Sequence, residues 1–324
     1  MVLAIQTESW TYKDHFTSPT TCSPMRILTT REEDAIGRRE PNAVYYHDVA
    51  PGKLTDQIEV VRDRIEVAID QENLCGLHLA SDARNALDCA MWVLETERTG
   101  IHVWKVANIC QPIYLHTTLT IGADAPEQMA ATAHANTHTR ACKLKLTDSD
   151  AKAYLLAVRT ALPDVWIGGD ANQGFTRREL ENFNPSLVDS PIGLIERPLP
   201  RGEDGALAGL RSPIPLVADE SAQSLSDIEQ LATHHDLINT KLDRCGGLTE
   251  GLLTALEARQ RGLRIMVGCM NGTPLAMEPG FVLGQLCDFV DLDVPIFLAR
   301  DHRPSAGCGD GNIWCTKGAW GAAT

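Results

Sequence analysis

The chain lacks several features that would assign it to a particular class of protein. It has no run of about 18 apolar residues, so we expect no transmembrane helix. Its first ten residues contain Gln6, Thr7 and Glu8 too early for a signal-peptide core, which favours a cytoplasmic protein. Basic residues are in the minority, because 29 Lys and Arg stand against 43 Asp and Glu. Nucleic acids and anionic membranes recruit clustered Lys and Arg, so neither is an expected partner.

The cysteines lack the spacing of a metal or redox motif. None of the ten belongs to a C-x-x-C pair, and Cys89, Cys142 and Cys269 lie inside apolar runs. Buried free thiols in a reducing compartment explain this pattern better than disulfides or zinc ligands do.

The length, 324 residues, suits one large domain or two modest ones, and the hydropathy pattern changes near Gln111. Before that point, Met25–Thr30 has the pattern of a strand, whereas Leu54–Ile69 and Asp82–Glu97 have the pattern of amphipathic helices. We therefore predict an α+β domain over residues 1–110.

From Gln111 onward, short β-rich runs alternate with amphipathic helical stretches. The predicted strands are Ile113–Ile121, Cys142–Leu146, Val165–Gly169, Gly193–Glu196, Leu216–Asp219, Leu237–Lys241, Ile265–Gly268 and Phe289–Leu292. Eight strands alternating with helices favour a parallel barrel, although a doubly wound open sheet would give the same alternation.

Polar residues close most of these strands, one βα unit apart. They are Lys145, Asp170, Glu196, Asp219, Lys241, Cys269 and Asp291. Any one of them alone is more often a loop residue than a ligand. In a barrel, however, they form a ring at the C-terminal face, and three consecutive units end in carboxylates.

Asp170, Glu196 and Asp219 offer an oxygen-only set of donors. Such a set suits Mg²⁺, with Mn²⁺ as a substitute, and the absence of a strand-end histidine disfavours zinc.

Lysines flank this group in the sequence. Lys143 and Lys145 lie two apart on one strand and therefore share a face, and Lys241 ends a strand four positions around the ring. A substrate carbon held between Lys145 and Lys241 would meet one amine on each side. Nearby cations and desolvation lower the pKa of a lysine, which makes a neutral amine available as a base.

Six motifs in chain order resemble those of the enolase superfamily, in its muconate-cycloisomerase-like branch, and are most similar to dipeptide epimerases of the L-Ala-D/L-Glu type. They are Lys143-Leu-Lys145, Asp170-Ala-Asn-Gln-Gly174, Ile195-Glu-Arg-Pro-Leu-Pro200, Ala218-Asp-Glu-Ser221, Lys241-Leu-Asp-Arg-Cys-Gly-Gly247 and Met266-Val-Gly-Cys-Met270. The resemblance implies a (β/α)7β TIM-like barrel over residues 111–295 with an N-terminal α+β capping domain. It also implies that residues 296–324 pack back on that cap.

The resemblance also implies roles for individual residues. Asp170, Glu196 and Asp219 would bind the metal, and Lys145 and Lys241 would be the two acid/base groups of a 1,1-proton transfer through an enediolate. The remaining implied residues bind substrate (Lys143, Cys269, Met270, Asp291 and Asp293, the last two pairing with the ammonium of a dipeptide) or support the ligands (Asn172, Glu220 and Asp243). Whether the chain forms a homo-oligomer stays open.

The chain departs from the family in the segment Thr17–Pro24, which has no arginine where acidic-dipeptide epimerases usually carry one. We therefore expect neutral dipeptides to be preferred, unless Arg26, Arg31 or Arg197 reaches the pocket. A second departure is Gly168-Gly169 before Asp170, where bulkier residues are usual, and it predicts a looser strand end.

Three other readings stay open. An N-acylamino acid racemase, o-succinylbenzoate synthase or cycloisomerase would share the metal site and lysines but would not need Asp291 and Asp293. A Schiff-base barrel aldolase would use one lysine and leave the three carboxylates unexplained. A non-catalytic relative would have no reason to keep both lysines and all three carboxylates.

Overall fold

The computed structural model describes residues 1–9, 24–32, 34–40, 51–67, 71–77, 79–146, 151–186, 192–298, 306–315 and 318–321. The segment 10–23, which holds most of the arginine-free loop, lies outside these residues. In the part of the chain that the structure describes, no helix is long and apolar enough to cross a membrane.

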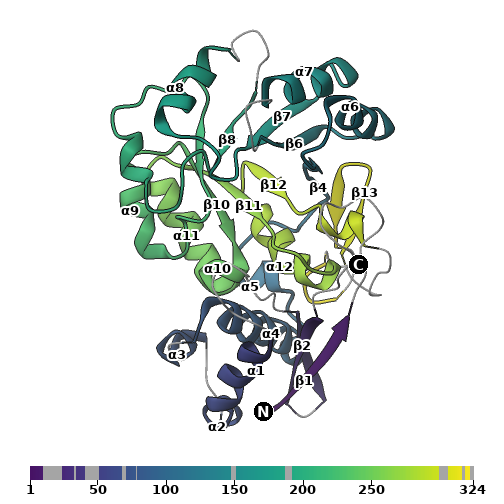
Figure 1. Cartoon of the computed structure of the whole chain (residues 1–324). Helices are drawn as coiled ribbons and strands as arrows, with labels where there is room; N and C mark the ends of the chain where they lie inside the picture. The colour runs from purple at the N-terminus through teal and green to yellow at the C-terminus, as the bar shows by residue number, and fades with distance from the viewer. Residues whose placement is uncertain are drawn as a thin grey trace.

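The N-terminal part is a cap built from a small sheet and helices, at the bottom of Figure 1. Strands β1 (Val2–Ser9), β2 (Pro24–Glu32) and β3 (Ala35–Arg39) form an antiparallel sheet in that order. In the described part of the chain it is followed by helices α1 (Pro51–Val60), α2 (Arg62–Glu66), α3 (Gln71–Leu74) and α4 (Ser81–Thr99). The single helix predicted over Leu54–Ile69 is thus two helices, with a turn at Val61 between them.

The predicted barrel is confirmed as an eight-stranded parallel sheet. Its strands are β5 (Leu119–Ile121), β6 (Ala141–Lys145), β7 (Trp166–Asp170), β8 (Ile195–Glu196), β9 (Leu216–Ala218), β10 (Leu237–Lys241), β11 (Arg264–Gly268) and β12 (Phe289–Asp291), paired in sequence order. The sheet is a nearly closed ring, because the residues just before β5 bond to the end of β12: Thr118 N donates to Val290 O at 3.0 Å, and Leu292 N donates to Thr117 Oγ1 at 2.8 Å.

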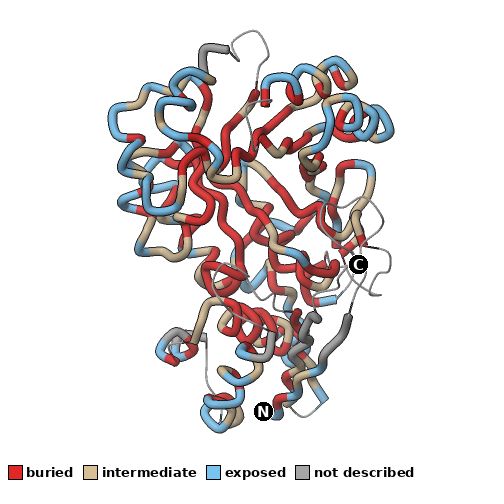
Figure 2. The backbone as a smooth tube through the Cα atoms, in the orientation of Figure 1, coloured by how far each residue is buried: buried red, intermediate tan, exposed pale blue. Residues whose placement is uncertain are grey.

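Helices cover the outside of the barrel (Figure 1). They are α6 (Pro126–Ala135), α7 (Ala151–Ala161), α8 (Arg177–Ser186), α9 (Ile228–Leu231), α10 (Leu242–Cys245), α11 (Leu248–Gln260) and α12 (Pro274–Gly284). Figure 2 shows the strands buried inside this layer and exposed outer faces on helices such as α6 and α7, whereas α10, which packs against the cap helix α4, and α12 are buried.

One predicted strand is wrong in its extent. Instead of a single strand over Ile113–Ile121, the chain forms β4 (Leu115–His116) and, after Thr117 and Thr118, β5 of the barrel. The two threonines separate the strands because their polar groups bond to the last barrel strand. Strand β4 pairs with β14 (Asn312–Trp314), which forms a hairpin with β13 (Gly307–Gly309).

The C-terminal residues pack between the barrel and the short helix α5 (Val103–Val106). Val103 N donates to Ala319 O at 3.1 Å, and Trp104 Nε1 donates to Gly321 O at 3.0 Å. These hydrogen bonds join the C-terminal residues to α5, but they do not show where one domain ends and the next begins. The domain boundaries at residues 110 and 295 therefore stay predictions.

Neighbouring side chains fill the space beside the two glycines that precede Asp170. A Cβ at Gly168 would lie 2.8 Å from the Trp166 ring, and one at Gly169 would lie 2.4 Å from Leu146. Both glycines are buried. Close packing of larger side chains therefore explains these glycines, and the prediction of a looser strand end was wrong.

The cap docks on the barrel through helix α4 and the end of β3. Asp88 accepts hydrogen bonds from the backbone N–H (3.1 Å) and hydroxyl of Thr249, in the first turn of α11. Arg84 Nη2 donates to Cys245 O at 2.7 Å, and Asn85 Nδ2 donates to Asp243 Oδ1 at 2.7 Å. The buried side chains of α4 are mostly small, so α4 approaches the barrel helices α10 and α11 closely.

Candidate active site

Three carboxylates lie side by side where three neighbouring strands end. Asp170 ends β7 and is the register partner of Glu196, which ends β8, while Asp219 follows β9 directly. Their exposed fractions are 1%, 0% and 1%. The predicted strand-end spacing therefore brings them together inside the barrel mouth.

The two predicted acid/base lysines flank this row. Lys145, on β6, donates to Asp170 Oδ2 at 2.7 Å, and Lys241, on β10, donates to Asp219 Oδ2 at 2.9 Å. Each amine thus contacts an outer member of the carboxylate row, with Glu196 between the two. Burial lowers the pKa of Lys241, and although Asp219 opposes this, the net shift is downward. A lysine with a lowered pKa is a better base at neutral pH.

Lys143 has the opposite electrostatic environment. Burial disfavours its charge, but Asp291, which it contacts directly, and Glu196, 3.4 Å away, hold its pKa well above the usual value. Lys143 is therefore a fixed ammonium inside the barrel rather than a base.

Asp291 and Asp293 lie next to this ammonium. Asp291 also accepts a hydrogen bond from the Thr118 hydroxyl, and Asp293 Oδ2 accepts one from Thr120 N at 2.5 Å. Burial, followed by repulsion from Asp291, raises the pKa of Asp293 to about 6. Two neighbouring carboxylates of this kind attract a cation, such as a substrate ammonium.

The loop after β11 lies beside Asp291 and Asp293. Burial and the charges of Asp291 and Asp293 hold the pKa of Cys269 well above its usual value, which keeps the thiol neutral beside them. Met270 follows it and is half-buried.

Of the three residues predicted to support the ligands, Asn172 and Glu220 contact a ligand or its neighbour, and Asp243 contacts the cap instead. Asn172 N donates to Asp170 Oδ1 at 2.9 Å, and its side-chain oxygen accepts from Arg197 Nη2 at 2.5 Å. Glu220 forms an ion pair with Arg197. Asp243 instead faces the cap, where it accepts from Asn85.

Sequence reasoning missed four residues that complete this network. Asn239 Nδ2 donates to Glu196 Oε1 at 2.6 Å, and Arg244 donates to Asp219. Thr118 bonds Asp291, and Arg197 Nη2 lies 3.3 Å from Asp170 Oδ2. Asn239 was detectable, since it precedes Lys241 by two residues on one strand and therefore shares its face. For Arg197, the sequence suggests only a role as partner of a substrate side chain.

The chemistry of this donor set fits a hard divalent cation. Among the described residues, no three His, Cys, Asp or Glu side chains are grouped tightly enough to hold an ion as they stand. Ammonium and guanidinium groups lie against the carboxylates instead. Yet Glu196 Oε2 is buried without a hydrogen bond, and burial with repulsion from Asp219 and Asp170 raises the pKa of Glu196. A cation among these carboxylates would relieve that repulsion.

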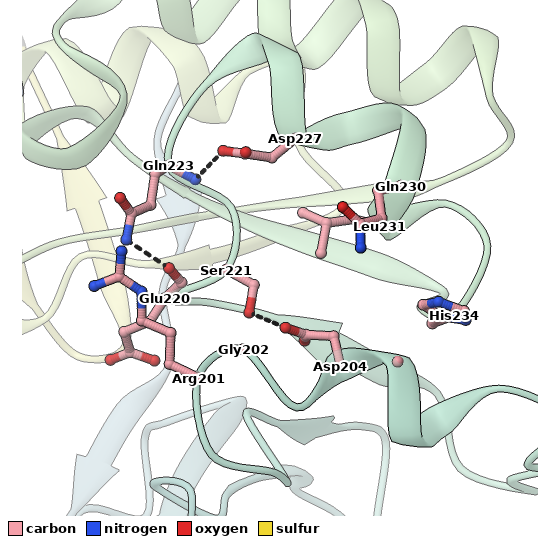
Figure 3. Close-up of a pocket in the computed structure, with 11 residues that line it drawn as sticks. Arg201, Gly202, Asp204, Glu220, Ser221, Gln223, Asp227, Gln230, Leu231 and His234 are labelled. Atoms are coloured by element: carbon pink, nitrogen blue, oxygen red, sulfur yellow. Dashed lines mark hydrogen bonds between the residues drawn. The ribbon is translucent and has the colours of Figure 1, made fainter.

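A separate cavity of about 250 Å³ lies beside the site, between the loops that follow β8 and β9. Figure 3 shows Ser221 donating to Asp204 and Gln223 N donating to Asp227 on its walls. Glu220 lines this cavity, but neither Lys145 nor Lys241 does. The cavity therefore lies next to the carboxylate row and is not part of the site between the two lysines.

Comparison with known proteins gives consistent matches. The family model described as "Enolase C-terminal domain-like" matches residues 124–287. The L-Ala-D/L-Glu epimerase of Escherichia coli K12 is 33% identical, over 86% of this chain and 88% of its own. An N-acetyl-D-glutamate racemase from a Pseudoalteromonas species is 36% identical, over 75% and 78%. An enolase family member from Agrobacterium tumefaciens with homology to dipeptide epimerases, solved with sodium and L-Ala-L-Glu, has a TM-score of 0.93 at 34% identity, covering 97% and 98%.

Proposed function

The chain belongs to the enolase superfamily, as an isomerase of the racemase and epimerase class, and we propose that it inverts the α-carbon next to the carboxylate of a dipeptide by 1,1-proton transfer. The observation that carries the proposal is the placement of Lys145 and Lys241 on opposite flanks of one carboxylate row. Two bases on opposite sides of a carbon are what inversion requires, because one removes a proton and the other delivers one to the opposite face.

Each lysine has a distinct part in this transfer. Lys241, whose pKa is lowered by burial, takes the α-proton from one stereoisomer, and Lys145 delivers a proton from the other side. The roles reverse for the other stereoisomer. Lys143 remains an ammonium, so it stabilises negative charge near the reacting carboxylate without exchanging protons.

Asp170, Glu196 and Asp219 would hold a divalent cation, which we propose is Mg²⁺. When bound, it supplies positive charge that stabilises the substrate carboxylate as negative charge moves onto it. The protein's own contribution is to hold the three carboxylates, through Asn172, Asn239 and Arg244, in a buried setting where charge interactions are strong.

Proton exchange at the α-carbon in D₂O tests the proposal on a panel of L,L-dipeptides. We expect the wild type to exchange and epimerise, and we expect Lys145→Ala and Lys241→Ala each to lose epimerisation. Each variant should retain exchange from only one stereoisomer, because the other base remains. Lys152→Ala is the control, since this lysine is exposed on α7. Full epimerisation by both single variants would end the two-base mechanism.

A second candidate, racemisation of N-acylamino acids, is favoured by the pairing of Asp291 with Lys143 and Thr118, which leaves fewer oxygens for a substrate ammonium. Comparing kcat/KM for Ala-X with that for N-acetyl-X separates the two. We expect Ala-X to be preferred and the preference to vanish in Asp293→Asn. A preference for N-acetyl-X in the wild type would support the second candidate.

A further inference from the structure

The loop from Cys269 to Thr273 connects β11 to α12 and carries two of the proposed substrate contacts. Its far end, Thr273, is completely buried and is the N-cap of α12, with its hydroxyl accepting from Leu275 N at 3.3 Å. Whatever fixes Thr273 therefore fixes one end of the loop.

A carboxylate from the cap holds Thr273 in place. Glu40, just after β3, accepts hydrogen bonds from Thr273 N at 3.1 Å to Oε1 and 3.3 Å to Oε2, and another from the Thr273 hydroxyl. The side chain is only 1% exposed. A Cβ on the preceding residue, Gly272, would lie 3.5 Å from Glu40 Oε1, so the loop backbone passes directly against the carboxylate.

The neighbouring residue strengthens the attachment. Arg39 Nη1 donates to Leu275 O at 2.7 Å, so two consecutive cap residues, the last of β3 and the one after it, bind the start of α12. Thr273 is bound to the cap, whereas Cys269 lies beside Asp291 and Asp293. The cap thus reaches the substrate contacts through a loop of five residues.

We propose that Glu40 is a positioning residue for substrate binding, which acts through Thr273 on Cys269 and Met270. This inference rests on the proposed function. Removing the carboxylate frees the Thr273 end of the loop, and displacing a substrate contact by about 1 Å costs up to about a hundredfold in activity. Binding of the substrate side chain suffers more than proton transfer, because both lysines lie on other strands.

A matched control exists in the same interface. Asp88 is also a cap carboxylate, 2% exposed, that bonds the backbone N–H and hydroxyl of a threonine in the first turn of a barrel helix. Its partner, Thr249, lies in α11, away from Cys269 and Met270. Loss of either carboxylate should lower stability similarly, and only loss of Glu40 should change substrate binding.

The experiment measures KM, kcat and melting temperature for Glu40→Ala, Glu40→Gln and Asp88→Ala, with the wild type run first on the same dipeptides. We expect Glu40→Ala to raise KM about tenfold with kcat within about threefold, and Glu40→Gln, which keeps an acceptor and the volume, to restore most of the affinity. Asp88→Ala should melt at a similarly lower temperature with KM unchanged.

Equal KM in Glu40→Ala and wild type, or an equal rise in Asp88→Ala, would overturn the role of Glu40. Absence of exchange in the wild type would instead count against the proposed function. Should Glu40→Ala fail to fold, Glu40→Asp decides, because its shorter side chain draws the carboxylate away from Thr273. A rise in KM there without loss of melting temperature supports the role, and an unchanged KM refutes it.

Discussion

Gly268, the last residue of β11, leaves room for the base on the neighbouring strand. A Cβ at this position would lie 2.6 Å from Asn239 Oδ1 and 3.0 Å from Lys241 Cε. Gly268 is the register partner of Lys241, and its backbone conformation is one that alanine also adopts. The substitution Gly268→Ala therefore adds one methyl group against Lys241 and Asn239 and little else.

The size of the effect follows from these distances. Ordinary van der Waals contact begins at 3.4 Å, so Lys241 Cε must move by about 0.4 Å and Asn239 by about 0.8 Å. Since a misplacement of about 1 Å costs about a hundredfold, we expect kcat to fall by about tenfold to fiftyfold. That corresponds to ~1.4 to 2.3 kcal/mol of transition-state stabilisation.

Proton exchange in D₂O with each dipeptide stereoisomer provides the assay. Exchange from the isomer served by Lys241 should fall, while exchange served by Lys145, on the opposite flank, should stay within about twofold of the wild type. Gly205→Ala is the control, because nothing lies within 4 Å of a Cβ there. Equal losses from both isomers, or kcat within twofold of the wild type, would show that Gly268 does not set the position of Lys241.

Three further results are expected. Trp166→Ala should lower stability by about 3 kcal/mol, because this indole packs into the space that Gly168 and Gly193 leave, and thermal unfolding should show the loss while kcat stays unchanged. Burial raises the pKa of Glu278 to about 8, so its contribution to stability is complete below its unfolded value of 4.5 and is lost as pH rises through 8; Glu278→Gln should therefore melt higher than wild type at pH 9 but not at pH 5, and a constant difference would contradict this. Ala-Gln should exceed Ala-Glu in kcat/KM because Thr17–Pro24 has no arginine, and a tenfold preference for Ala-Glu would show that another cation binds the acidic side chain.

The barrel and the convergence of the three carboxylates were predictable, because both follow from the regular alternation of strands and helices along the sequence. Each βα unit returns the chain to the same face, so Asp170, Glu196 and Asp219 had to lie together once they ended successive strands. Lys143 and Lys145 shared a face for the same reason. Periodicity does not show which side chains pair, however, and the pairing of Lys143 with Asp291 joins residues 148 positions apart.

Compensating contacts were beyond the sequence. Gly169 predicts a loose strand end only if its surroundings are ignored, and the side chains that pack there, Leu146 and Ile192, come from other segments of the chain. The split of the first barrel segment depends on Thr117 bonding Leu292 N, far along the chain. The hydrogen bonds between Thr273 and Glu40 join residues 233 positions apart, and a local sequence pattern cannot predict a contact at that separation.

The contacts that join Glu40 and Asp88 to helices α12 and α11 also constrain the order of events during synthesis. The cap leaves the ribosome first, but its two carboxylates meet Thr249 and Thr273 only 161 and 233 residues later. At usual elongation rates this delay is on the order of ten seconds or more. During that time both carboxylates lack the threonines that bind them in the finished protein, so these two contacts between cap and barrel form only after residues 249 and 273 have been made.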